Sequence, residues 1–225
     1  MTDSKHPCPE LAHAWLLGLL LLSSAGLAWG TDLSKTLSLA QQRYGSSAAH
    51  TVQAWRRLID DSRSLSELDK LERANAFFNR HIVFASDALV WQREDYWATP
   101  LELMGRGRGD CEDYAIAKYM TLQLMGVGHE RLRIIYVEAQ TDPRTSQAHM
   151  VLGYYQQPNQ EPLILDNLWP AIHRSSIRSD LTPIFSFNHV GFWLGAQHVS
   201  LGDPTIRLSR WRDLLQRMRE DGLLP

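Results

Sequence analysis

Residues 105–126 read GRGRGDCEDYAIAKYMTLQLMG, a glycine-rich turn that leads into a helical pattern ended by a further glycine. Asp110 is a residue type favoured at a helix N-cap, where its carboxylate would accept N–H groups of the first turn, and Gly109 permits a tight turn before it. We therefore predict a helix from residue 111 to residue 125. Cys111 would be its first residue, and apolar residues lie on the same face: Ala115, Tyr119 and Leu122.

The segments on either side of this helix differ in their hydrophobic pattern. Upstream, apolar residues recur at helical spacing between residues 33 and 59, and Ser66 with Asp69 resembles a capping box that opens a third helix. We interpret residues 81–104 as irregular. Downstream, strand-like runs follow one another and an amphipathic helix comes last: RIIYVEA (133–139), AHMVLGYY (148–155), PLILDN (162–167), PIFSFN (183–188), VGFWL (190–194) and residues 211–218. This order predicts an α+β fold in which the helix of Cys111 packs on an antiparallel sheet.

The length of 225 residues suits one domain, preceded by a segment with the pattern of an export signal. Residues 16–27 form an apolar run that is short for a membrane span, and small residues at positions 28 and 30 match a signal-peptidase site. We expect residues 1–30 to be a cleaved signal peptide, with an uncleaved anchor as the alternative, and residues 31–225 to be a single domain. The formal net charge of −2 argues against a nucleic-acid binder.

Cleavage would leave Cys111 as the single cysteine, because Cys8 departs with the signal. A lone thiol in an exported protein is buried and inert, a metal ligand, or kept for its reactivity. A position in the first turn of a helix lowers a thiol pKa, since the positive end of the helix dipole stabilises the thiolate. The cysteine count by itself leaves these interpretations open.

His149 begins a predicted strand, and Asp166 ends the strand that would return after a turn at residues 156–160. With the turn centred between Gln157 and Pro158, His149 and Asp166 lie directly opposite each other, with Cβ atoms about 4.5–5.5 Å apart. A carboxylate in that place orients an imidazole and stabilises its charged form. A structural pair at the rim of the sheet is the alternative, and a one-residue slip in the hairpin would separate the two side chains.

Cys111, His149 and Asp166 together have the residue types needed for nucleophilic acyl transfer. His149 would take the thiol proton, the thiolate would attack a carbonyl carbon, and Asp166 would hold the imidazole. We expect the oxyanion to be stabilised by the backbone N–H of Cys111, with Gln147 or Trp91 as candidate side-chain donors.

The carboxylates around Cys111 oppose thiolate formation and need an explanation of their own. Asp110, Glu112 and Asp113 are explained in part as acids favoured in the first turn of a helix. They are also suitable oxygen ligands for a hard cation, and Ca²⁺ suits such a set in an exported protein. Zinc is the weaker hypothesis, because the sequence after the signal has no second cysteine and no histidine pair at ligand spacing.

Four separated blocks resemble one known family: GRGDCEDYAIAKY, LRIIYVEA, QAHMVLGYY and EPLILDN. In order and content they are similar to the LapG-type periplasmic proteases, also called bacterial transglutaminase-like cysteine proteinases. The segments DYWATPLELMG and PIFSFN extend the resemblance from residue 70 to residue 195. The resemblance implies a papain-like, transglutaminase-type fold, and it places the family's catalytic cysteine, histidine and aspartate at Cys111, His149 and Asp166.

The resemblance also implies a function. The family is calcium-dependent, with acidic ligands that match Asp110 and Glu112 and, less closely, Asp113. Its members act in the periplasm on large surface adhesins, which they cut near the N-terminus beside a di-alanine to release biofilm cells. The periplasmic domain of an inner-membrane cyclic di-GMP receptor restrains them. We therefore expect a periplasmic endopeptidase that meets the membrane only through its partners. An acyl transferase that crosslinks amines and a non-catalytic binding module are the alternatives.

Overall fold

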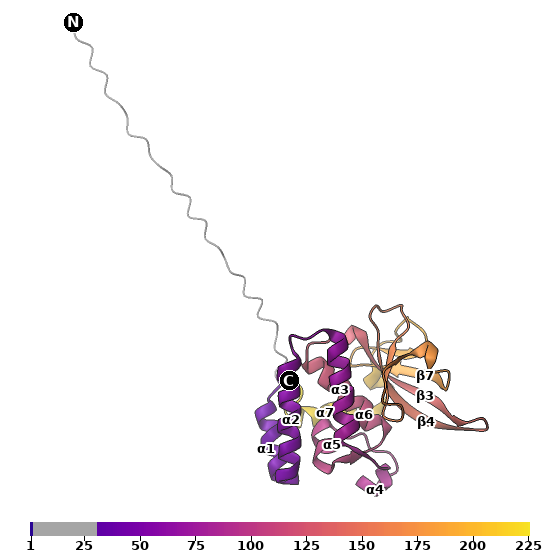
Figure 1. Ribbon diagram of the computed structural model, residues 1–225, viewed down its shortest axis with the longest axis horizontal. Helices are drawn as coiled ribbons and strands as arrows, with labels where there is room; N and C mark the ends of the chain where they lie inside the picture. Colours follow the sequence, from indigo (N-terminus) through magenta and orange to yellow (C-terminus); the bar gives the residue numbers. More distant parts are fainter. Residues whose placement is uncertain (2–30) are drawn as a thin grey trace.

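The structure is a computed structural model that describes residue 1 and residues 31–225. The segment predicted to be a signal peptide, with Cys8, therefore lies outside the described residues apart from Met1. Three N-terminal helices gather on one side and the main sheet lies on the opposite side, with helix α6 between them (Figure 1). This arrangement confirms the predicted α+β class. Among the described residues, no helix combines the length and the apolar character needed to cross a membrane.

The N-terminal helices closely follow the predicted pattern. Their bounds are α1 (Leu33–Tyr44), α2 (Ser46–Ser62) and α3 (Glu67–His81). The Asp32 side chain caps α1, and the Ser66 hydroxyl accepts the backbone N–H of Asp69, as the capping pattern predicted. Trp55 is buried in α2, and its Nε1 donates to Thr121 Oγ1 at 2.8 Å, which ties α2 to α6.

The segment between α3 and α6 is more regular than predicted. Thr99 Oγ1 accepts the backbone N–H of Glu102, whose carboxylate accepts the N–H of Thr99 in return, and Pro100 occupies the first helical position. These start signals open a helix that is too short for a periodic apolar pattern to be recognised. The segment contains β1 (Val83–Phe84), α4 (Asp87–Trp91), α5 (Pro100–Arg106) and β2 (Arg108–Gly109), and β1 pairs with β2 in parallel.

Helix α6 (Cys111–Leu124) follows β2 directly and is buried over most of its length. It packs on strands β3 and β4 of the main sheet and on helices α3 and α5.

The six strands of the main sheet are antiparallel throughout, in the order β6-β5-β4-β3-β7-β8. The strands are β3 (Leu132–Asp142), β4 (Thr145–Tyr154), β5 (Leu163–Leu165), β6 (His173–Arg174), β7 (Leu181–Phe187) and β8 (Phe192–Leu194). Helix α7 (Ser209–Glu220) and three 3₁₀ turns, His129–Arg131, Ser175–Ile177 and Pro204–Ile206, complete the elements of the described chain.

The alternation of side chains along β3 and β4 divides the buried apolar residues between two cores. Ile134 and Leu152 face α6 and belong to the larger core, which also takes in the N-terminal helices. Ile135 and Val151 point to the other face and form a small separate cluster with residues of neighbouring strands. Both faces of the sheet therefore carry buried apolar side chains, and α6 packs on the face of the larger core.

Candidate active site

One pocket of about 240 Å³ contains both Cys111 and His149. Cys111 is the first residue of α6, and His149 lies in β4, which packs against that helix. The remaining lining residues come from β1, the turn before α4, the start of α6, β4 and the loop after β5: Phe84, Ser86, Asp110, Glu112, Gln147, Ala148 and Leu168. Gln147, one of the two predicted oxyanion donors, thus lines the pocket, whereas Trp91 does not.

His149 and Asp166 are in contact, although not in the predicted register. Nε2 of His149 lies 2.8 Å from Oδ1 of Asp166, and both side chains are buried. Leu152 pairs with Leu165, so the β4–β5 ladder is offset by two residues from the predicted hairpin, and Asp166 lies just beyond its end. A shift of two residues keeps every side chain on the same face of the sheet, so the two side chains still meet, now as diagonal neighbours.

Asp166 is held from several directions. Arg178 Nη2 donates to Oδ2 at 2.8 Å, and the backbone N–H of Leu168 donates to Oδ1 at 3.0 Å. Burial by itself raises the pKa of Asp166, but the hydrogen bond and charge of His149, the Leu168 N–H and Arg178 lower it to about 2. The carboxylate is therefore ionised and can only accept a hydrogen bond, so Nε2 of His149 carries the hydrogen that it donates to Oδ1, and Nδ1 is the unprotonated nitrogen of the neutral imidazole.

The surroundings of Cys111 disfavour its thiolate. Burial raises the pKa of the Cys111 thiol, and the negative charge of Glu112 raises it further. Sγ also donates a hydrogen bond to Glu112 Oε2 at 3.0 Å, and Asp110 adds a second nearby charge. The backbone N–H of Met150 acts in the opposite direction and lowers the pKa. The helix start that we expected to lower the thiol pKa is outweighed by burial and by these acids, and a positive charge close to the acids would favour the thiolate.

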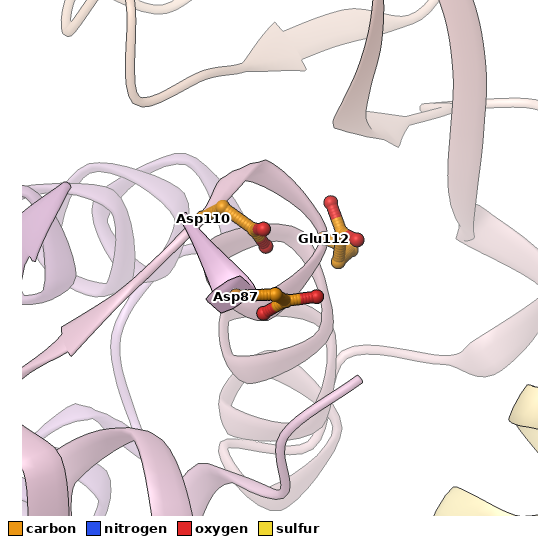
Figure 2. Close-up of side chains that lie close together, drawn as sticks. All are labelled: Asp87, Asp110 and Glu112. Carbon is orange, nitrogen blue, oxygen red and sulfur yellow. The ribbon is translucent and has the colours of Figure 1, made fainter. Parts of the chain in front are cut away.

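Asp110 occupies the N-cap position of α6, but its carboxylate does not cap the helix. No first-turn N–H donates to it, and its Oδ1 is buried without a hydrogen-bond partner among the described residues. The predicted capping role is therefore wrong. The physical reason is the parallel pairing of β1 with β2, which brings Asp87 beside the start of α6, and the Asp110 carboxylate is turned toward Asp87 and Glu112 (Figure 2).

Asp87, Asp110 and Glu112 form a carboxylate cluster, in which one oxygen from each residue lies within 4.8 Å of the others (Figure 2). Burial, together with neighbouring negative charges, raises the pKa of Asp87 to about 6 and that of Asp110 to about 10. Within the described chain, Oδ1 of Asp87 and Oδ1 of Asp110 are buried and lack hydrogen-bond partners. Unpartnered oxygens that repel one another fit a hard cation, and an all-carboxylate set suits Ca²⁺.

The carboxylate cluster differs by one residue from the predicted ligand set. Asp113 is fully buried and accepts the backbone N–H of Ala98 at 2.7 Å, and its other oxygen lies against Gly109, so it faces the turn and not the cluster. Asp87 is the residue that sequence reasoning missed. It lies in the segment interpreted as irregular, and only the pairing of β1 with β2 places it beside Asp110.

Comparison with known proteins relates this chain to one family. The family model for bacterial transglutaminase-like cysteine proteinases (BTLCP) matches residues 43–179. Among solved structures, Legionella pneumophila LapG is 39% identical with a TM-score of 0.73, and the match covers 84% of this chain and 99% of that chain. The EGTA-treated form of LapG is 39% identical with a TM-score of 0.74 over the same coverage of both chains. The calcium-bound form is 40% identical with a TM-score of 0.71, covering 83% of this chain and 99% of that one. No curated protein sequence gives a significant match.

Proposed function

The chain belongs to the bacterial transglutaminase-like cysteine proteinases, and we propose that it is a calcium-dependent endopeptidase with Cys111, His149 and Asp166 as its catalytic residues. Its transglutaminase-like fold, predicted from the sequence motifs, is confirmed by the similarity to LapG. The observation that carries the catalytic proposal is the pocket shared by Cys111 and His149, together with the contact that His149 makes with Asp166.

The positions of the three residues suggest a step for each. The thiol proton of Cys111 passes to Nδ1 of His149, and the thiolate attacks the carbonyl carbon of a peptide bond. The backbone N–H of Cys111 and the side chain of Gln147 donate to the oxyanion of the tetrahedral intermediate. His149 then gives the proton to the leaving amine, and water hydrolyses the remaining thioester to a carboxylic acid and the free thiol. Asp166 stays ionised and holds the imidazole throughout.

Asp87, Asp110 and Glu112 are the residues that would hold calcium. A Ca²⁺ ion bound to them supplies positive charge that offsets the carboxylates next to the thiol and so favours the thiolate. Glu112 belongs both to the carboxylate cluster and to the acids that raise the pKa of Cys111. The calcium-bound and EGTA-treated forms of L. pneumophila LapG support calcium as the ion.

We further propose that the substrate is the N-terminal region of a large surface adhesin, cut beside a di-alanine so that biofilm cells disperse. The enzyme would act in the periplasm, after export directed by residues 1–30 as a signal peptide. The periplasmic domain of an inner-membrane cyclic di-GMP receptor would restrain it. The four motif blocks and the similarity to LapG support these assignments. The exposed apolar side chains of Phe84 and Leu168 at the pocket support a polypeptide substrate.

A cleavage assay tests the proposed function. Residues 31–225 are incubated with a recombinant N-terminal adhesin fragment that contains a di-alanine, in calcium or in a calcium chelator. We expect two product fragments in calcium, none in the chelator and none from the Cys111→Ala variant. Thr51→Ala on α2 is the matched control and should cleave like the wild type, because the half-exposed Thr51 hydroxyl donates to the backbone oxygen of Ser47, far along the chain from the pocket.

Each arm of this assay has its own contrary outcome. Undiminished cleavage by Cys111→Ala would rule out the thiol mechanism, and full activity in the chelator would rule out the role of calcium. Cleavage of a fragment whose di-alanine has been replaced by two arginines would contradict the proposed cut site. A labelled amine added to the reaction separates hydrolysis from crosslinking, because an acyl transferase would incorporate the label into the substrate.

A further inference from the structure

Arg178 contacts the Asp166 oxygen that His149 does not, and we propose that Arg178 is a positioning residue of the catalytic site. It holds the Asp166 carboxylate in the rotation that presents Oδ1 to the imidazole. The inference rests on the proposed function and deepens it, since this positioning affects turnover only if His149 and Asp166 act in catalysis.

Each oxygen of Asp166 has its own side-chain partner. Oδ1 lies 2.8 Å from His149 Nε2, and Oδ2 accepts a hydrogen bond from Arg178 Nη2 at 2.8 Å. The terminal torsion of an aspartate side chain has a broad energy profile, so a carboxylate anchored at one oxygen rotates easily. Anchoring the second oxygen removes this freedom and keeps the first directed at His149.

Arg178 is fixed in turn by contacts that depend on the shape of a guanidinium. Its Nε donates to Asp180 Oδ1 at 2.9 Å and its Nη2 donates to Asp180 Oδ2 at 2.8 Å. Trp169 lies over the guanidinium, with its ring centre 4.8 Å from Cζ, and the whole side chain is buried. A planar group with several donors satisfies all of these contacts at once, which a lysine ammonium cannot do. The result is a continuous series of hydrogen bonds in which Asp180 holds Arg178, Arg178 holds Asp166, and Asp166 holds His149.

The charges in this series also fit the proposed reaction. An ionised carboxylate that is buried without a counter-charge is unstable. In the proposed reaction His149 carries the thiol proton for only part of the cycle, whereas an arginine is always cationic. Arg178 therefore keeps Asp166 compensated during the part of the cycle in which His149 is neutral, and the carboxylate is ready when the proton arrives.

The test compares Arg178→Gln and Arg178→Lys with Arg174→Gln, which removes an exposed arginine that pairs with Glu161. The first measurement is cleavage of the di-alanine adhesin fragment. The second is the low-field proton NMR signal of His149 Nε2–H, which reports its hydrogen bond to Asp166. We expect Arg178→Gln to lower kcat about 10- to 100-fold with KM nearly unchanged, because a misdirected base slows the chemical step. Arg178→Lys should lose less activity, and Arg174→Gln none.

The NMR signal separates positioning from a general loss of structure. We expect it to shift or disappear in Arg178→Gln and to be unchanged in Arg174→Gln. A wild-type kcat in Arg178→Gln, or a fall in kcat with an unchanged signal, would overturn the inference. If Arg178→Gln does not fold, Arg178→Lys is judged by the same two criteria. Failure of the proposed function is recognised separately, because the wild type would then not cleave the fragment or Cys111→Ala would still cleave it, while the NMR measurement would still report on Arg178.

Discussion

Asp110 and Asp113 lie three residues apart at the start of one helix, yet their carboxylates have different surroundings. Asp110 faces Asp87 and Glu112 in the carboxylate cluster. Asp113 faces the backbone of the preceding segments, where the N–H groups of Ala98 and Asp110 oppose the rise in its pKa that burial causes. Acids that lie close together in the sequence therefore divide between the carboxylate cluster and contacts with the local backbone.

This division predicts different effects for two isosteric substitutions. Asp87→Asn removes one anionic ligand and should raise the calcium concentration needed for half-maximal cleavage roughly tenfold or more, with activity restored at high calcium. Asp113→Asn should leave the calcium requirement unchanged and lower the free energy of unfolding by about 1–3 kcal/mol, because a buried hydrogen-bond acceptor is weakened. Calcium titrations of cleavage, with urea unfolding of both variants, measure the two effects. Equal shifts in calcium requirement would contradict the assignment.

Gly109 is needed for close packing and not for a special backbone conformation. A Cβ there would lie 2.5 Å from Leu103 Cδ1 and closer still to Asp113 Oδ2, so Gly109→Ala should destabilise the protein by about 1–3 kcal/mol and displace the start of α6. Gly107 is the matched comparison, because it has a φ of 64° and open space around it. Gly107→Ala should cost about 1 kcal/mol through backbone strain and leave kcat unchanged. Urea unfolding and cleavage rates of the two variants distinguish these cases.

At the scale of elements, helix α5 sets the approach to α6 and depends on its N-terminal cap. Thr99 Oγ1 accepts the Glu102 N–H and also donates to Asp221 Oδ2 at 2.6 Å, so one hydroxyl joins α5 to the end of α7. Thr99→Ala should lower the free energy of unfolding by about 2 kcal/mol, since it removes the cap and a buried hydrogen bond. Thr51→Ala on α2 should change it by less than about 0.5 kcal/mol. A Thr99→Ala variant as stable as Thr51→Ala would show that the cap contributes little.

The longer elements were predictable because their side-chain periodicity extends over several turns or strand pairs. Helices α1, α2, α3 and α6 and the longer strands were found in this way. The two-residue strands β1 and β2 and the short helix α4 exist only through tertiary contacts, so local sequence does not indicate them. The same limit explains Arg178 and Asp87. The fold brings both residues to the site, Arg178 from the end of the 3₁₀ turn after β6 and Asp87 from the first position of α4, and neither has a local motif.

The hairpin shows how a site can be predicted although its geometry is wrong. We expected His149 and Asp166 to be directly opposite, and the ladder is shifted by two residues. The prediction of a shared face survives an even shift, because side chains alternate along a strand. Sequence patterns therefore indicate which face a residue occupies more reliably than they indicate its partner across the ladder. The catalytic roles of the two residues remain a prediction.

At the scale of the whole molecule, the lowered pKa of Asp166 predicts part of the loss of folding stability at acidic pH. Its folded-state pKa is about 2, below the ordinary value of 3.8, so the folded protein binds this proton less readily than the unfolded chain. The stability from this group is complete above about pH 5 and is lost as the pH falls toward 2. Between pH 5 and pH 2, the unfolding free energy of the wild type should fall by roughly 2 kcal/mol more than that of Asp166→Asn. Urea unfolding of both proteins at several pH values in this range measures the difference. Unfolding free energies that fall equally with pH in the wild type and in Asp166→Asn would contradict the prediction.

Calcium should stabilise the whole fold as well as the site. A ligand that binds only the folded state at a hundred times its Kd adds about 2.7 kcal/mol of stability. For a chain of this size, that raises Tm by roughly 5–10 °C. Thermal unfolding with calcium and with a chelator measures the shift, and Asp87→Asn should reduce it at equal calcium. An identical Tm in both conditions would contradict binding at the carboxylate cluster.

The parallel pair of β1 and β2 also affects how fast the carboxylate cluster can open. Asp87 is kept beside α6 by a ladder of two residues on each strand, in which the Val83 N–H donates to Gly107 O at 3.0 Å and the Ala85 N–H donates to Gly109 O at 2.9 Å. So short a ladder can separate while the main sheet stays intact. We expect the amides of Val83 and Ala85 to exchange with deuterium far sooner than those of β3 and β4, and calcium to slow that exchange. The lifetime of the bound ion would then follow this local opening, and the enzyme would respond to calcium faster than it unfolds.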